Sequence, residues 1–89
     1  MNNYTNNTNT NLQRNITSII EEKLEKVDKN LNDCLILKLE NGETIFVFHS
    51  NINKYRWEDL NINQKFKFIV EEGKNGANIL LDFEITAYE

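Results

Sequence analysis

The chain has 89 residues, which is enough for one domain and too short for two. A hydrophobic share of 39% and a charged share of 27% predict a globular domain with a well-hydrated surface. The net charge of −4 excludes a broad electrostatic contact with duplex DNA or anionic membranes, which requires clustered lysine and arginine. It does not exclude single strands, because bases also stack on aromatic rings.

Residues that usually cross-link small domains through disulfides or metal ions, or that carry out catalysis, are scarce in this chain. The single cysteine, Cys34, cannot form an internal disulfide, and with the single histidine, His49, it gives no metal-binding cluster. The acidic residues show no spacing typical of a general acid and base. No apolar run reaches the roughly 18 residues of a membrane span. The chain also lacks the basic start followed by an apolar stretch that would predict export. We therefore expect a cytoplasmic, non-catalytic protein with no cofactor and no membrane contact.

The first 15 residues are mostly asparagine and threonine. Their few apolar side chains offer too little surface to offset the entropy lost on ordering. We expect residues 1–15 to be a disordered tail and residues 16–89 to form the domain.

Residues 16–31 fit two secondary structures. Ser18 and Glu21 match a helix capping box, Glu22 and Lys26 form a favourable i,i+4 pair, and apolar residues recur at helical spacing, namely Ile16, Ile20, Leu24, Val27 and Leu31. Tertiary context can override such helix signals and make this segment a first strand. The helix reading leads to an α+β fold, with an N-terminal helix packed on a four-stranded antiparallel sheet.

A β-hairpin is predicted over residues 34–49. The apolar run of residues 34–39 is followed by Asn41 and Gly42 and then by the β-prone run that starts at Thr44. Asn-Gly between apolar runs favours a type I′ turn, in which both residues take a positive φ. This turn fixes which strands are neighbours.

Two further strands follow a long loop. Residues 50–63 lose periodicity and are expected to form a loop with one helical turn at most. Phe66, Phe68 and Val70 then alternate with polar residues, and a second alternating run extends from Ile79 to Ala87. A turn containing Gly73 and Gly76 joins the two runs.

Several of these segments together resemble the cold-shock domain, a five-stranded OB-type barrel that binds single-stranded RNA and DNA. Residues 45–52 (IFVFHSNI) are similar to the V-F-V-H-F-S-A-I strand of that family, residues 57–60 (WEDL) to its F-x-x-L loop, and residues 64–76 to its G-Q-x-V-x-F-x-V strand and E-x-G-x-x-G turn. The resemblance covers about residues 24–85. It implies an all-β fold, a small five-stranded antiparallel OB/cold-shock-like barrel, whose first strand would lie within residues 19–28.

The chain also departs from the family pattern. Glu25-Lys26-Val27 stands where the family has K-W-F, and residues 32–37 (NDCLIL) stand in place of the K-G-F-G-F-I motif, so the stacking rings of that half-site are missing. By position, the resemblance implies stacking on Phe46, Phe48, His49 and Trp57. Lys38 and Arg56, with Lys26 and Lys54, are the nearest basic residues that could meet phosphates.

Two functions follow as hypotheses. The first is binding of single-stranded nucleic acid, RNA foremost, through this reduced aromatic face; the second is a protein-interaction module in which the same patch, with Leu35, Leu37 and an acidic rim, meets a protein. Both hypotheses require Phe46 and Phe48 to face outward and Val47 to face inward. Alternation with a period of two equally allows the two phenylalanines to lie in the core and Val47 to lie outside. Trp57 fits a plug at the barrel end as well as a stacking site.

Overall fold

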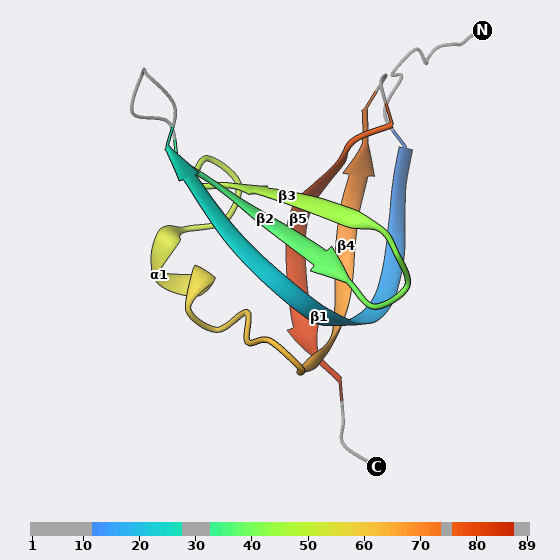
Figure 1. Ribbon diagram of the computed structural model, residues 1–89. Helices are drawn as coiled ribbons and strands as arrows, with labels where there is room; N and C mark the ends of the chain where they lie inside the picture. Colours follow the sequence, from blue (N-terminus) through green and yellow to red (C-terminus); the bar gives the residue numbers. More distant parts are fainter. Residues whose placement is uncertain (1–11, 28–32, 74–75, 87–89) are drawn as a thin grey trace, which may run out of the picture.

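The computed structural model describes residues 12–27, 33–73 and 76–86, and the protein is all-β. The described residues form five strands and one short helix, in chain order β1 (Leu12–Val27), β2 (Asp33–Leu39), β3 (Thr44–Phe48), α1 (Lys54–Trp57), β4 (Lys65–Glu72) and β5 (Asn78–Ile85) (Figure 1). Among these residues no helix is long and apolar enough to cross a membrane.

Strand β1 is long and strongly curved, and it takes part in both halves of the sheet (Figure 1). Residues 12–19 pair with β4, and residues 20–27 pair with β2 after an irregularity between Ile20 and Glu22. The predicted helix over this segment, and with it the α+β alternative, is therefore wrong for residues 16–27. Ile16, Ser18 and Ile20 alternate toward the core, so the strand period prevails over the helical spacing.

The strand predicted within residues 19–28 is confirmed as far as Val27, but it begins earlier, at Leu12. Residue 28 lies outside the described part of the chain. Residues 12–15, which we assigned to the tail, pair with β4 and belong to β1. They extend the ladder because backbone pairing needs no apolar side chain, whereas a boundary based on apolar content begins the domain at residue 16. Residues 1–11 lie outside the described part of the chain.

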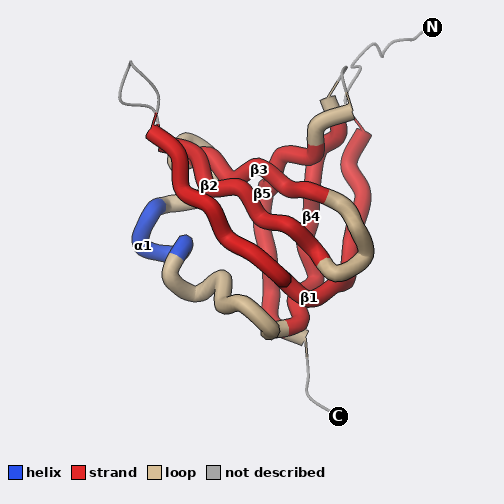
Figure 2. The backbone as a smooth tube through the Cα atoms, viewed as in Figure 1, coloured by secondary structure: helices blue, strands red, loops and turns tan. Residues whose placement is uncertain are grey.

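The strand pairings follow the order β1-β2-β3-β5-β4, and β4 pairs again with β1 (Figure 2). Four of the five contacts are antiparallel, but β3 and β5 are parallel, with Ile45 opposite Asn78 and Phe46 opposite Ile79. The expectation of an antiparallel-only arrangement is therefore wrong. The reason is parity: an odd number of strands in a ring cannot alternate direction at every contact, so one pair must be parallel.

The core lies inside this sheet and follows the alternation of the strands. Phe66, Phe68 and Val70 of β4 are fully buried, as are Ile45 and Val47 of β3. The Phe66 ring lies 5.5 Å from that of Phe68 and meets that of Phe83 edge-on at 5.7 Å. Each buried side chain of this size contributes about 1.5–3 kcal/mol, so these positions account for much of the stability of a small domain.

The β2–β3 hairpin was predicted correctly, but its turn is of another type. The N–H of Gly42 donates to the carbonyl of Leu39 at 3.0 Å, and the N–H of Leu39 donates to the carbonyl of Glu43 at 2.9 Å. Gly42 has φ +93°, whereas Asn41 has no positive φ. This is the pattern of a three-residue loop that ends in a left-handed glycine, in place of the predicted type I′ turn.

The connection from β3 to β4 contains the single helical turn expected there, α1. The Asn53 side chain caps it by accepting a hydrogen bond from the backbone N–H of Tyr55 at 2.9 Å. Ile52, Trp57 and Leu60 point into the core, and the Trp57 indole N–H donates to the carbonyl of Ile52 at 3.0 Å. The loop thus closes one end of the core (Figure 2).

Candidate functional site

The face of β3 that points away from the core carries two phenylalanines. Ile45 and Val47 are fully buried, so Phe46 and Phe48, which alternate with them, lie on the outer face and are half-buried. The alternative orientation, with both phenylalanines in the core, is thereby excluded. Two neighbouring aromatic rings on one strand face are available for contact.

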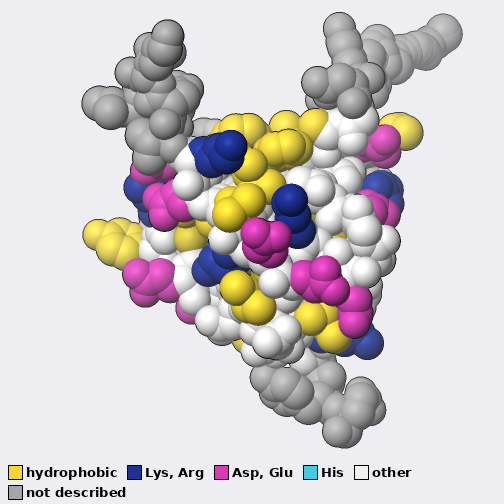
Figure 3. Space-filling view, viewed as in Figure 1, with side chains coloured by type: hydrophobic (Ala, Val, Ile, Leu, Met, Phe, Trp, Pro, Cys, Tyr) yellow, Lys and Arg dark blue, Asp and Glu magenta, His cyan; other side chains and the backbone are white. Residues whose placement is uncertain are grey.

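The strand register places aliphatic residues beside Phe46. Ile36 of β2 lies directly opposite Phe46, Leu24 of β1 lies opposite Ile36, and Ile79 of β5 lies opposite Phe46 on its other side. We call Leu24, Ile36, Phe46 and Ile79 the outer apolar band. Figure 3 shows hydrophobic side chains gathered over β2 and β3, with charged side chains around them.

The next outward position along the strands holds Phe48. It pairs with Cys34 of β2, and Cys34 pairs with Lys26 of β1. On the opposite side of the band, Lys38 of β2 pairs with Thr44. Lys26 and Lys38 are exposed, and neither makes an ion pair with another described residue. The two lysines therefore flank the band with their charges available to a ligand.

Three of the six predicted site residues share one face, and a fourth follows it in the chain. Phe46, Phe48 and Lys38 share the outer face of β2 and β3, and His49 is exposed in the turn that follows β3. The expected positions of these residues are thus compatible with one contact surface.

The other two predicted residues, Trp57 and Arg56, do not join this surface. Trp57 is only 5% exposed and its indole N–H is bonded to Ile52, so its ring cannot stack on a base in this conformation. Arg56 has its Nη2 3.2 Å from Oδ1 of Asp82, and its guanidinium lies 4.4 Å from the centre of the Phe83 ring. Both residues belong to α1. This helix lies against the end of the sheet because Ile52, Trp57 and Leu60 are buried in the core.

The residues proposed for the protein-interaction alternative also need correction. Leu35 is 3% exposed and Leu37 is fully buried, so neither contributes to the patch. Ile36 between them faces outward instead. The run of residues 34–37 is apolar on both faces, so its sequence carries no alternation from which the outward residue could have been identified.

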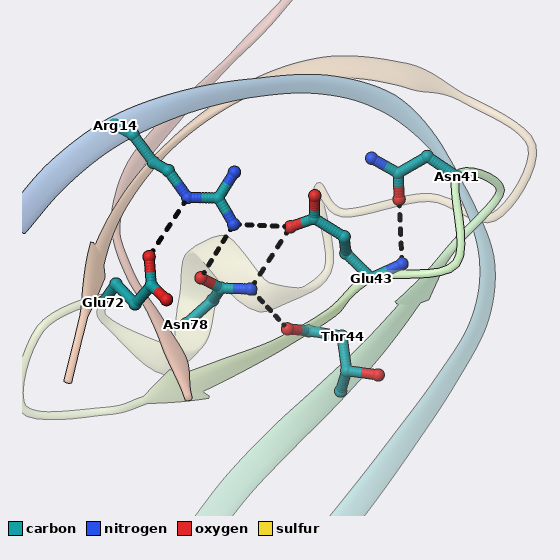
Figure 4. Close-up of polar contacts among 6 residues, drawn as sticks. All are labelled: Arg14, Asn41, Glu43, Thr44, Glu72 and Asn78. Carbon is teal, nitrogen blue, oxygen red and sulfur yellow. Dashed lines mark hydrogen bonds and ion pairs between the residues drawn. The ribbon is translucent and has the colours of Figure 1, made fainter. Parts of the chain in front are cut away.

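A polar cluster fixes the junction of β3 and β5 next to the band (Figure 4). The buried Asn78 amide donates to the carbonyl of Thr44 at 3.2 Å and to Oε1 of Glu43 at 3.3 Å. The Arg14 guanidinium meets the same Glu43 oxygen at 2.8 Å, lies 3.3 Å from Oδ1 of Asn78, and approaches Glu72 at 3.6 Å. This cluster joins β1, β4, β5 and the β2–β3 hairpin where Ile79 meets Phe46.

Cys34 is a half-buried thiol on the outer face. Burial raises the pKa of the Cys34 thiol above its ordinary value of 9.0, and a hydrogen bond with the backbone of Val47 opposes that shift. At neutral pH the side chain is therefore a small apolar neighbour of Phe48. Among the residues that the structure describes, no three His, Cys, Asp or Glu side chains are grouped to hold a metal ion.

The chain matches no protein-family model and no curated protein. The function must therefore be inferred from the geometry and chemistry of this surface.

Proposed function

We propose that the protein is a divergent OB-type barrel of the cold-shock kind and that it binds single-stranded nucleic acid, RNA foremost, without catalysis. The observation that carries the proposal is the outward placement of Phe46 and Phe48 on one strand, beside Lys38 and His49. The closed pairing order and the resemblance of residues 45–52 to a cold-shock strand support the assignment of the barrel.

The spacing of the two rings suits consecutive bases. Residues two apart in a strand are separated by about 6.6 Å, so Phe46 and Phe48 offer two adjacent platforms on the same face. Stacking contributes roughly 1–3 kcal/mol per base and depends little on base identity, because every base has a π-face. Two platforms predict binding of modest affinity and low sequence preference.

Electrostatics has a small part in this proposal. With a net charge of −4, the protein lacks the field that draws nucleic acid to basic proteins, and Lys26 and Lys38 are the cations beside the band. Each phosphate contact to a single strand contributes a slope of about −0.7 in log K against log salt. Binding should therefore depend on salt far less than that of a basic single-strand binder.

A direct titration tests the proposal. Fluorescence anisotropy of end-labelled oligo-U and oligo-dT at low salt should rise with a dissociation constant of about 1–50 micromolar. No rise and no mobility shift at tens of micromolar would contradict it. Trp57 is not the reporter to use, because it is buried away from the outer face.

A second candidate, binding of a protein partner, is favoured by one specific observation. Three members of the outer apolar band, Leu24, Ile36 and Ile79, are aliphatic, and Leu24 is 37% exposed. Aliphatic side chains stack poorly on bases but bury well against protein. If Leu24→Ala and Ile36→Ala leave oligo-U affinity unchanged while Phe46→Ala weakens it at least about fivefold, the nucleic-acid proposal holds over this one.

A further inference from the structure

The second half of β1 has an edge that no other described strand covers. β1 pairs with β4 through residues 12–19 and with β2 through residues 20–27, on opposite edges. On the β4 side, the backbone of Ile20 still bonds to the loop before β4, but beyond Ile20 no described strand continues this side (Figure 1). A pocket of about 320 Å3, lined by Glu25 and Lys54 among others, separates this part of β1 from α1. Such an open edge is a place where a further strand can add to a sheet.

The hydrogen bonds of the hairpin show which backbone groups point to this open edge. The N–H of Leu39 donates to the carbonyl of Glu43 at 2.9 Å, so the backbone groups of Leu39 point toward β3. Backbone groups alternate in direction along a strand, so those of Lys38 and of every second residue before it point toward β1. Their partners in β1 are Glu22, Leu24 and Lys26. The backbone groups of Lys23 and Glu25 therefore point to the open edge, where they have no hydrogen-bond partner within the described part of the chain.

The side chains along the open edge have a charge pattern that is complementary to itself. The sequence around Leu24 reads Glu-Lys-Leu-Glu-Lys, so equal distances from Leu24 in the two directions give opposite charges. If a second copy runs antiparallel with Leu24 opposite Leu24, Lys23 lies opposite Glu25 of that copy. Likewise, Glu22 lies opposite Lys26 of that copy. Opposite charges placed directly across two strands stabilise their pairing, and like charges oppose it.

The backbone and the charges select the same register for such a pair. Groups that point to the open edge in one copy must meet groups that do so in the other, so the two-fold axis passes through a residue and not between two. An axis through Lys23 or Glu25 places that residue opposite itself, with like charges together. An axis through Leu24 pairs Lys23 with Glu25 and leaves no like charges opposed. Leu24 is 37% exposed, so its side chain can meet its own copy across the axis.

We propose that β1 pairs antiparallel with β1 of a second copy about Leu24, which gives a two-fold symmetric dimer. The outer apolar bands of the two copies, which both end at Leu24, then lie side by side on one face of the joined sheet. Lys38 stays outside the contact because it belongs to β2. A few backbone hydrogen bonds and exposed ion pairs make a small interface, so the association should be weak and sensitive to salt. The dimer does not depend on the proposed nucleic-acid binding.

Sedimentation equilibrium of the full chain tests the self-association. Between about 10 and 500 micromolar protein, the average mass should rise from that of one chain toward that of two. Raising the salt from about 50 to 500 mM should lower the average mass at a fixed protein concentration, because exposed ion pairs are screened. The mass of a single chain throughout this range overturns the proposal.

Charge reversals at Glu22 and Lys26 test the register. Both side chains are exposed and neither makes an ion pair with another described residue, so their reversal breaks no ion pair of the described monomer. Glu22→Lys and Lys26→Glu each bring like charges together at both symmetric positions and should weaken the association at least about tenfold. The variant that carries both reversals is complementary again and should associate like the parent. Parent-like association of either single variant overturns the register.

Mixing the two single variants separates a lost contact from a damaged fold. Glu22→Lys and Lys26→Glu are complementary to each other, so together they should form a mixed dimer at the strength of the parent. Glu40→Lys and Lys65→Glu, exposed changes outside the open edge, are the matched controls and should each associate like the parent. Phe46→Ala should do the same, which distinguishes this contact from one through the outer apolar band. Absence of the mixed dimer, or loss of the dimer in Phe46→Ala, overturns the proposal.

Discussion

Phe46 and Ile36 lie directly opposite each other on the outer face of β3 and β2, and both are half-buried. Aromatic and β-branched residues paired in this way stabilise a sheet by about 0.2–1 kcal/mol, far less than either residue contributes when it is buried in a core. The pair therefore contributes little to the free energy of folding, although it leaves apolar surface exposed. That surface is the basis of the proposed binding site.

Asn78 should matter more for stability than any exposed asparagine. Asn78→Ala removes the donors to Thr44 and Glu43 and the acceptor of Arg14, at a site only 6% exposed. We expect the free energy of unfolding to fall by about 1–3 kcal/mol in urea denaturation. Asn15→Ala, on the exposed side of β1, should change it by less than about 0.5 kcal/mol. Equal effects of the two variants would show that the cluster is not structural.

Trp57 should act on stability and not on strand binding. Trp57→Phe removes the indole N–H that satisfies the carbonyl of Ile52, and it leaves space in the core. The expected loss is about 1–3 kcal/mol of unfolding free energy, with oligo-U affinity of the folded variant within about twofold of the parent. A large loss of oligo-U affinity with unchanged stability would contradict this account and would indicate that Trp57 takes part in binding.

Cys34 should react slowly with alkylating reagents. The thiolate is the reactive form, and burial raises the thiol pKa above 9.0, so the thiolate fraction at pH 8 is smaller than in free cysteine. The pH profile of iodoacetamide alkylation should have its midpoint above 9.0 in the folded protein. The folded protein favours the protonated thiol of Cys34. The contribution of this thiol to the free energy of unfolding is therefore present below pH 9.0 and is lost as the pH rises through the raised pKa. In urea the midpoint should return to its ordinary value; a folded midpoint at or below that value would contradict the burial.

Lys38 should supply one phosphate contact. Lys38→Gln is expected to make the slope of log K against log salt shallower by about 0.7 for oligo-U, measured between about 50 and 200 mM salt. Lys65→Gln, an exposed lysine on β4, is the matched control and should leave the slope unchanged. Similar slopes for both variants and the parent would remove Lys38 from the site.

The strands could be predicted from the sequence wherever one face is polar. The alternation around Phe66 and Phe68 identified β4, and Asn41-Gly42 identified the β2–β3 hairpin. The sequence could not reveal the face of β2, because residues 34–37 are all apolar, nor the burial of Trp57, which depends on where the loop folds back. Helical spacing in β1 was overridden by pairing with β2 and β4, which are distant in sequence.

The residues that complete the outer apolar band were missed for a related reason. Leu24 and Ile79 adjoin Ile36 and Phe46 through strand register, across β1 and β5. Register is a tertiary property, and a single sequence shows it only where a tight turn fixes it. The predicted type I′ turn would have placed Ile36 opposite Val47, and only the observed three-residue loop places it opposite Phe46. No tight turn fixes the β3–β5 pair.

The most direct test of the account is the affinity of labelled oligo-U for three variants, measured by anisotropy at low salt after circular dichroism has shown that each is folded. Phe46→Ala and Phe48→Ala should each weaken binding by about fivefold to a hundredfold, because each removes one stacking platform. Ile62→Ala, an apolar residue 47% exposed in the loop before β4, should leave the affinity unchanged. Binding by both phenylalanine variants at the parent affinity would contradict the proposal that the outer face of β3 is the nucleic-acid surface.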